Sequence, residues 1–143
     1  MKCKIISISH KPSDWEKQAL QFYSKQLPNY FDVSYAEVKP FSSKSMDVTS
    51  TLEAEGLEIL KHVDLDAHII LWDRQGEKIN SLGFAGLLKD QMDRGKNINF
   101  IIGGAYGSSE KLLQTSQLIL SASEFTFPHR LFKIFLIEQI FRA

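Results

Sequence analysis

This chain of 143 residues has a single cysteine, a formal net charge of zero and few long apolar runs. Cys3 is the only cysteine, which excludes an internal disulfide and a metal site built from several cysteines. Lysine and arginine together number 17, as do aspartate and glutamate, so no overall positive field draws the chain to nucleic acid. Any contact with RNA must therefore come from a local patch of basic residues.

Signals for export, membrane insertion and metal binding are also missing. The apolar stretch after Met1 is too short for a signal peptide or a membrane span, so we expect a soluble, cytoplasmic protein that contacts no membrane. The four histidines, at positions 10, 62, 68 and 129, do not have the spacing of metal ligands. We predict no structural or catalytic metal.

Apolar residues, at 43% of the chain, suffice for the core of one compact domain, which we expect to span residues 1–143. Short β-branched or apolar runs predict strands at 4–9, 31–38, 68–73, 98–102 and 118–120, of which 31–38 alternates like a strand near a sheet edge. Helical patterns lie between them, and a last helix is predicted from about 128 to 142. This alternation predicts an α/β fold with a mostly parallel sheet covered by helices on both faces.

Local signals refine this outline. Capping residues are expected at Ser13 with Glu16 as a capping box, at Asn80 or Ser81, at Ser108 or Ser109, and at Thr126 before Pro128. Core-facing stripes are expected at Trp15, Ala19, Phe22 and Tyr23 in one helix, and at Leu82, Ala85, Leu88 and Met92 in another that ends at Gly95. Residues 73–76 predict a turn, and residues 39–47 predict a flexible loop.

Two strand exits point to a ligand site. One runs from Gly103 to Gly107 with three glycines in five residues, and the other is a polar loop from Ser121 to His129. Ligands of parallel sheets bind outside the carboxyl ends of the strands, where Leu71 also lies, so we predict that the three segments converge on a nucleoside-like ligand. Each loop viewed alone is also explained by a tight turn or a helix cap.

The last helix is apolar on most of its surface, which favours a partner subunit and hence a homodimer. Glu138 and Arg142 are spaced as an ordinary helical ion pair. His129 suits a hydrogen-bonded core histidine better than a catalytic base. Two basic clusters are interpreted as solvated surface or, alternatively, as phosphate contacts: Lys2, Lys4, His10 and Lys11, and Arg130, Lys133 and Arg142.

Four ordered motifs carry a family resemblance. They are 71–78 (LWDRQGEK) followed by 81–85 (SLGFA), 100–107 (FIIGGAYG), 120–129 (LSASEFTFPH) and 136–143 (LIEQIFRA). They resemble the RlmH family of bacterial SPOUT-class methyltransferases, which modify pseudouridine at N3 in large-subunit ribosomal RNA. Residues 55–56 and 59–60 also match family positions, so the resemblance extends over nearly the whole chain.

The resemblance implies a homodimer, a C-terminal trefoil knot and an S-adenosyl-L-methionine site. By motif, the cofactor contacts would be Leu71, Gly103, Ala122, Ser123, Glu124, Phe125, Thr126 and Phe127. Glu138 would deprotonate or orient the imide of the base, and Arg142 would hold a phosphate or the base. Because the net charge is zero, we expect recognition of ribosomal RNA within the assembled ribosome.

Two other functions stay open at this point. Family members typically continue beyond the motif that ends here at Ala143, into a tail that helps to build the active site. The second hypothesis is therefore a knotted, cofactor-binding, ribosome-associated protein with impaired catalysis. The third is a flavodoxin-like or other nucleotide-binding protein.

Overall fold

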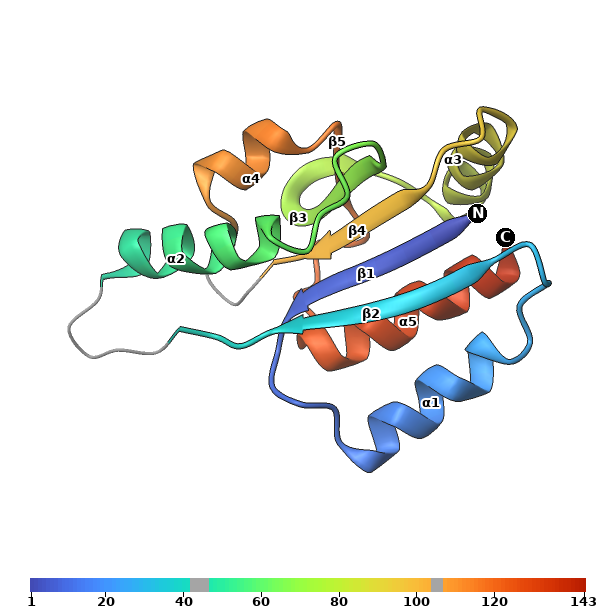
Figure 1. Cartoon of the computed structure of the whole chain (residues 1–143), viewed down its shortest axis with the longest axis horizontal. Helices are drawn as coiled ribbons and strands as arrows, with labels where there is room; N and C mark the ends of the chain where they lie inside the picture. Colours follow the sequence, from blue (N-terminus) through green and yellow to red (C-terminus); the bar gives the residue numbers. More distant parts are fainter. Residues whose placement is uncertain (42–46, 104–106) are drawn as a thin grey trace.

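A computed structural model describes residues 1–41, 47–103 and 107–143 (Figure 1). The strands are β1 (Lys2–Ile8), β2 (Asp32–Val38), β3 (His68–Lys78), β4 (Ile98–Ile102) and β5 (Leu118–Ser121). The helices are α1 (Asp14–Ser24), α2 (Val48–Leu60), α3 (Ser81–Asp93), α4 (Glu110–Thr115) and α5 (His129–Arg142). The predicted order of strands and helices is confirmed. Residues 42–46 of the predicted loop and 104–106 of the glycine run lie outside the described residues.

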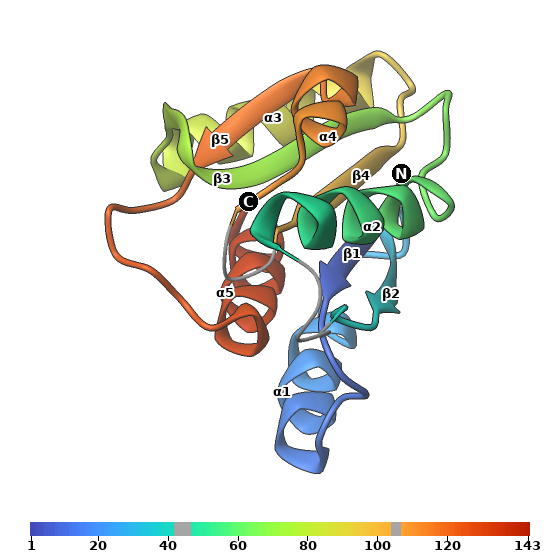
Figure 2. The same cartoon turned by 90° about the vertical axis from the view of Figure 1, so that its left-hand side faces the viewer.

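The five strands form one parallel sheet in the order β2-β1-β4-β3-β5, with β2 at an edge as predicted. One core cluster packs α1, α3 and α5 against the sheet, and a second packs α2 and α4 against the opposite face. Figure 2 shows α2 and α5 on opposite sides of β1. The predicted α/β fold with helices on both faces is thus confirmed, whereas the trefoil knot stays a prediction.

Central strand β4 explains why the sheet is stable. All five of its residues are buried, and it pairs with β1 on one side and β3 on the other. Phe100 and Ile101 point into the two opposite core clusters. Cys3 is 1% exposed, and burial raises the pKa of its thiol to about 12. The thiol is therefore a neutral core group.

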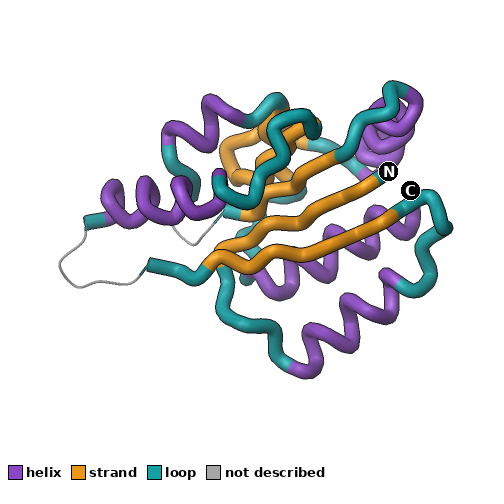
Figure 3. The backbone as a smooth tube through the Cα atoms, in the orientation of Figure 1, coloured by secondary structure: helices purple, strands orange, loops and turns teal. Residues whose placement is uncertain are grey.

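β3 is longer than predicted, and the turn predicted at residues 73–76 is wrong. The strand pairs Trp72 with Leu120, bends, and then pairs Glu77 with Leu120 and Lys78 with Ser121. Figure 3 shows this curl as a tightly bent segment of strand. A Cβ on Gly76 would lie 2.7 Å from backbone atoms of β5, so only glycine allows this approach.

Several helix starts follow the predicted signals. Asn80 accepts from the backbone N–H of Gly83 at 2.8 Å, and Ser109 accepts from that of Leu112 at 3.2 Å. These bonds decide between the neighbouring candidates. Thr126 was expected to cap α5, but the helix begins at His129 after Pro128 with no side-chain cap bond, so that prediction is wrong. Gly95 takes φ of 66° after α3, as the predicted helix end requires.

Two of the apolar stripes that were predicted to face the core contain side chains that are exposed to solvent. Trp15 and Phe22 of α1 are 49% and 62% exposed, and Leu82 of α3 is 86% exposed. The buried side chains of α1 are instead Leu20 and the charged Glu16. Periodicity cannot identify a buried carboxylate, because it scores only apolar residues.

Glu16 is buried because its oxygens serve two purposes. It forms the predicted capping box with Ser13, whose backbone N–H lies 3.4 Å from Oε1. Its Oε2 lies 3.0 Å from Nζ of Lys133 on α5, and both side chains are 0% exposed. The interpretation of Lys133 as solvated surface is therefore wrong.

The close approach at Gly76 yields a first prediction. Gly76→Ala should lower the free energy of unfolding by about 2–3 kcal/mol or more, because the new methyl group meets backbone rather than a movable side chain. Gly86→Ala is the matched control, since nothing lies within 4 Å of its Cβ position on α3. The control should gain about 1 kcal/mol from helix propensity. Urea unfolding followed by circular dichroism measures both, and equal stabilities would contradict the close approach.

Candidate functional site

A cavity of about 940 Å³ opens at the carboxyl ends of β3, β4 and β5. Its walls come from the end of the straight part of β3 and its curl, from the exit of β4, from the loop after β5 and from the start of α5. Its lining includes Trp72, Gly103, Ser108, Ala122, Ser123, Phe125, Thr126, Phe127 and Phe132. The volume suits a ligand the size of a nucleoside with a side chain.

Six of the eight predicted cofactor residues line this cavity: Gly103, Ala122, Ser123, Phe125, Thr126 and Phe127. Leu71 does not, because its side chain is fully buried in the cluster on the α2 and α4 face. Glu124 points elsewhere and pairs with Lys78 at 2.6 Å, with both side chains largely exposed. The structure thus brings together the loops that the sequence pointed to.

The floor of the cavity carries unpaired polar groups. Among the described residues, the indole Nε1 of Trp72 and the hydroxyl of Ser108 are buried without a hydrogen-bond partner. A Cβ on Gly103 would lie 2.7 Å from that hydroxyl, so glycine leaves space there. Buried donors without partners are uncommon, and a ligand that pairs with them gains affinity. Sequence reasoning placed the segment of Trp72 at the predicted cleft but assigned no ligand contact to Trp72 or to Ser108, because each locally resembles a core or capping residue.

The loop after β5 is shaped by its own serines. The hydroxyl of Ser121 donates to the carbonyl of Ser123 at 3.1 Å, and Ser123 Oγ accepts from the N–H of Phe125 at 3.0 Å. Phe127 stacks on Phe135 of α5, with centroids 5.9 Å apart and planes at 12°. Phe125 and Phe127 stay 80% and 42% exposed. The loop therefore presents apolar rings beside a polar backbone.

Phe132 links the loop to the sheet. Its ring lies 5.5 Å from that of Trp72 and 6.1 Å from that of Phe127. It is 8% exposed and lines the cavity in the first turn of α5. The position of α5 consequently sets the shape of the cavity.

His129 begins α5 and leaves its Nε2 buried without a partner among the described residues. Burial lowers its pKa, and the charges of Lys133 and Arg130 lower it further. The ring is therefore a neutral side chain close to the cavity, and the hydrogen bond expected for a core histidine is not found at Nε2.

Glu138 and Arg142 lie away from this cavity. Glu138 Oε1 accepts from Nε of Arg142 at 3.0 Å, and its Oε2 accepts from Gln139 at 2.9 Å. Glu138 is more than two turns beyond His129, about 14 Å along the helix axis. The helical ion pair expected from the spacing is confirmed, and neither residue lines the cavity of its own chain.

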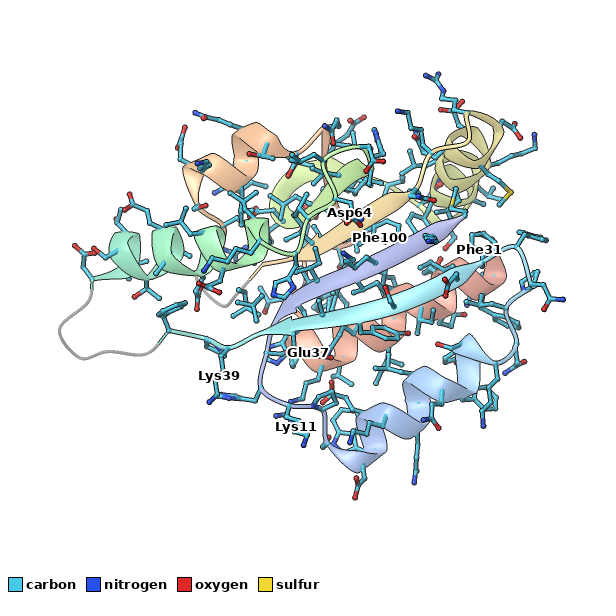
Figure 4. The ribbon with its side chains drawn as sticks, viewed as in Figure 1. Lys11, Phe31, Glu37, Lys39, Asp64 and Phe100 are labelled. Atoms are coloured by element: carbon cyan, nitrogen blue, oxygen red, sulfur yellow. The ribbon has the colours of Figure 1, made fainter. Side chains whose placement is uncertain are left out.

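The predicted basic clusters are largely neutralised. Lys4 pairs with Asp64 at 3.2 Å, Lys133 is buried, and Arg142 pairs with Glu138. His10 and Lys11 remain exposed, and Figure 4 shows Lys11 and Lys39 near the carboxyl end of β2. Within residues 1–41, 47–103 and 107–143, no acidic, histidine or cysteine side chains cluster in a way that would hold a metal ion. No helix in these ranges is long and apolar enough to cross a membrane.

Comparison with known proteins identifies the family. A family model described as "Predicted SPOUT methyltransferase" matches residues 1–143. The chain belongs to the SPOUT methyltransferase family. Because this is a family of methyltransferases, a methyl donor is expected.

Several relatives of this SPOUT protein carry one name. "Ribosomal RNA large subunit methyltransferase H" of Caldicellulosiruptor bescii is 37% identical over 98% of this chain and 92% of the relative. The protein of that name from Methylobacillus flagellatus is 32% identical over 100% of this chain and 92% of its own length. That from Clostridium botulinum (strain Langeland) is 34% identical, with 100% and 93% covered. The family resemblance found in the motifs is confirmed.

The lowered pKa of His129 gives a pH prediction. The folded protein binds this proton less readily than the unfolded chain, so the free energy of unfolding should fall as pH drops below about 6.5, the ordinary histidine value. His129→Gln should reduce this loss between pH 7 and 5.5. His62→Gln, at an exposed position, should keep the wild-type slope. Urea titrations at several pH values test it, and equal slopes in all three proteins would refute the assignment.

Proposed function

We propose that this protein transfers a methyl group from S-adenosyl-L-methionine to N3 of a pseudouridine in large-subunit ribosomal RNA, in the cytoplasm. The observation that carries the proposal is the cavity at the carboxyl edge, lined by six of the eight residues assigned to the cofactor by motif. The relatives named as ribosomal RNA large subunit methyltransferase H supply the substrate class.

The residues present fit such a cofactor. Trp72 Nε1 and the Ser108 hydroxyl are buried polar groups without a partner among the residues that the structure describes, and Gly103 leaves room beside Ser108. The backbone of the loop from Ala122 to Phe127 offers amides and carbonyls for an adenine edge and a ribose. The aromatic rings of Phe125 and Phe127 can pack on the base.

Methyl transfer depends mainly on the positioning of the methyl donor and of the accepting nitrogen. When bound, S-adenosyl-L-methionine would supply the methyl group for N3, and the imide proton would have to leave to a proton acceptor. The apolar rings of Phe127 and Phe132 exclude water from this side of the cavity, and the loop fixes the approach of the reacting nitrogen. In this proposal Glu138 deprotonates or orients the imide, and Arg142 holds a phosphate or the substrate nucleobase.

A homodimer reconciles these roles with the geometry. Glu138 is about 14 Å along α5 from the cavity end of its own chain, so it acts in the cavity of a second copy. Leu131, Phe135 and Phe141 of the same helix are 49%, 37% and 40% exposed, and Phe127 stacks on Phe135. An apolar surface of this kind on one helix suits a self-complementary interface.

A second candidate function is cofactor binding without turnover, in a knotted, ribosome-associated protein. The pairing of Glu138 with Arg142, away from the cavity, favours it. In that case calorimetry would detect S-adenosylhomocysteine binding, but no methyl group would reach ribosomal RNA.

The deciding experiment combines binding and transfer. Purified protein is titrated with S-adenosylhomocysteine by calorimetry, then incubated with large ribosomal subunits and radiolabelled S-adenosyl-L-methionine, and the RNA is digested for mass spectrometry. Methylated pseudouridine is expected, with free short RNA oligomers modified much less. Binding without transfer would favour the second candidate, and neither binding nor transfer would overturn the proposal.

Glu138→Gln provides a prediction on catalysis. Removing the carboxylate should lower kcat about 10²-fold or more and leave the affinity for S-adenosylhomocysteine within about threefold, because the proposed contact of Glu138 is with the imide of the substrate and not with the cofactor. Glu53→Gln, an exposed change on α2, is the control. Initial rates of methyl transfer measure both, and an unchanged kcat in Glu138→Gln would remove this residue from the mechanism.

A further inference from the structure

A buried group of charges joins three elements beside the cavity. Lys133 of α5 lies 3.0 Å from Glu16 of α1 and 3.7 Å from Glu37 of β2. Arg130, one turn earlier on α5, lies 3.4 Å from the other oxygen of Glu16. Lys133 and Glu16 are 0% exposed, and Glu37 is 26% exposed. We name these four residues the buried charge cluster.

The cluster is electrically balanced. Two carboxylates face two cations. Burial raises the pKa of Glu16, but the close approach of Lys133 and the charge of Arg130 outweigh burial, so that the pKa of this carboxyl is lowered. Glu16 consequently stays ionised inside the protein at neutral pH. The neutral ring of His129 lies one turn before Lys133 on α5 and adds no charge.

The charges of the cluster lie close together, but the hydrogen bonding of its central pair is incomplete. Lys133 Nζ and Glu16 Oε2 are at ion-pair distance, yet neither meets full hydrogen-bond geometry with any described residue. A buried ion pair of this kind adds little stability relative to a well-packed apolar pair. Its main consequence is selective placement, since only one arrangement of α1, β2 and α5 lets all four charges meet.

The placement of α5 determines the cavity. Phe132 directly precedes Lys133 and lines the cavity wall, and Phe127 and Pro128 form the step from the loop into the helix. No side-chain cap fixes this helix start. The nearest strong constraint on the first turn of α5 is therefore the contact of Arg130 and Lys133 with Glu16.

We infer that the buried charge cluster is a positioning device for the cofactor loop, in which Lys133 and Glu16 set the place of the first turn of α5 and thereby the orientation of Phe127 and Phe132 in the cavity. This inference rests on the proposed function for the identity of the ligand. Its structural part does not, because the order of the loop can be measured without ligand.

The test exchanges the ion pair for an apolar pair. Glu16→Leu combined with Lys133→Met keeps the volume of the core and removes both buried charges, while the partly exposed Glu37 and Arg130 can turn to water. The double variant should unfold at a urea concentration close to that of the wild type. Amide hydrogen exchange of residues 122–132 should nevertheless become at least fivefold faster in the ligand-free protein.

The binding readout separates positioning from stability. In the double variant the affinity for S-adenosylhomocysteine should fall at least tenfold, with a matching rise in the KM for the methyl donor and a kcat within threefold. The single variant Lys133→Arg should keep an affinity for S-adenosylhomocysteine within threefold of that of the wild type, because the cation is kept. The double variant Lys89→Ala with Asp93→Ala, at an exposed ion pair on α3, should leave both readouts unchanged.

Wild-type exchange rates and affinity in a folded double variant would overturn the inference. If that variant does not fold, Glu37→Gln tests the same point, because it removes one partly exposed partner of Lys133 and keeps the pair of Lys133 with Glu16. Faster amide exchange of residues 122–132 is expected in Glu37→Gln. Unchanged exchange would contradict the inference. Absence of S-adenosylhomocysteine binding in the wild type would instead refute the proposed cofactor, and the exchange measurement would still decide the role of the cluster.

Discussion

At Gly76 the backbone of β3 lies against the backbone of β5, and no side chain fits between them. This contact bends β3 so that the strand pairs with Leu120 twice, once from Trp72 and once from Glu77. The residues within the bend, from Asp73 to Gln75, become part of the cavity wall. Without the bend, β3 would end as an ordinary strand and the cavity would lack one side.

The opposite wall depends on α5, which is held in two chemically different ways. Aromatic packing joins Phe132 to Trp72 and Phe127, which orients the ring but tolerates small shifts. The ion pair between Lys133 and Glu16 is less tolerant, because displaced buried charges lose their partners. Apolar contacts thus fill the space between α5 and the sheet, and the ion pair fixes the position of the helix along its axis.

The fold was largely predictable because each element carries local signals. Asn80 caps α3, Gly95 follows its end, and the alternation in residues 31–38 predicted the edge strand β2. The errors arose where distant residues decide the outcome. A turn was predicted at Gly76 because turn-forming residues surround it, whereas the structure uses the glycine for contact with β5.

The candidate site shows the same division. The loops at Gly103 and Ala122–Phe127 were identifiable from composition and motif, since glycines and serines at strand ends are local features. The burial of Lys133 was not, because its partner Glu16 lies at the other end of the sequence. The buried polar atoms of Trp72 and Ser108 were not predictable for a related reason, because an atom without a hydrogen-bond partner is recognised only when the surrounding residues are in place.

The pairing of β3 with β5 also bears on how the molecule assembles. The two strands are adjacent in space but separated by α3, β4 and α4 along the chain, so their pairing closes a long loop and is slow compared with helix formation. During synthesis, β1 to β4 emerge before β5 and α5 exist. The edge of β3 is then uncovered, and a temporary cover by a chaperone would protect it from pairing with other chains. The ligand cavity is accordingly among the last parts of the molecule to form, after the ribosome has made Phe132.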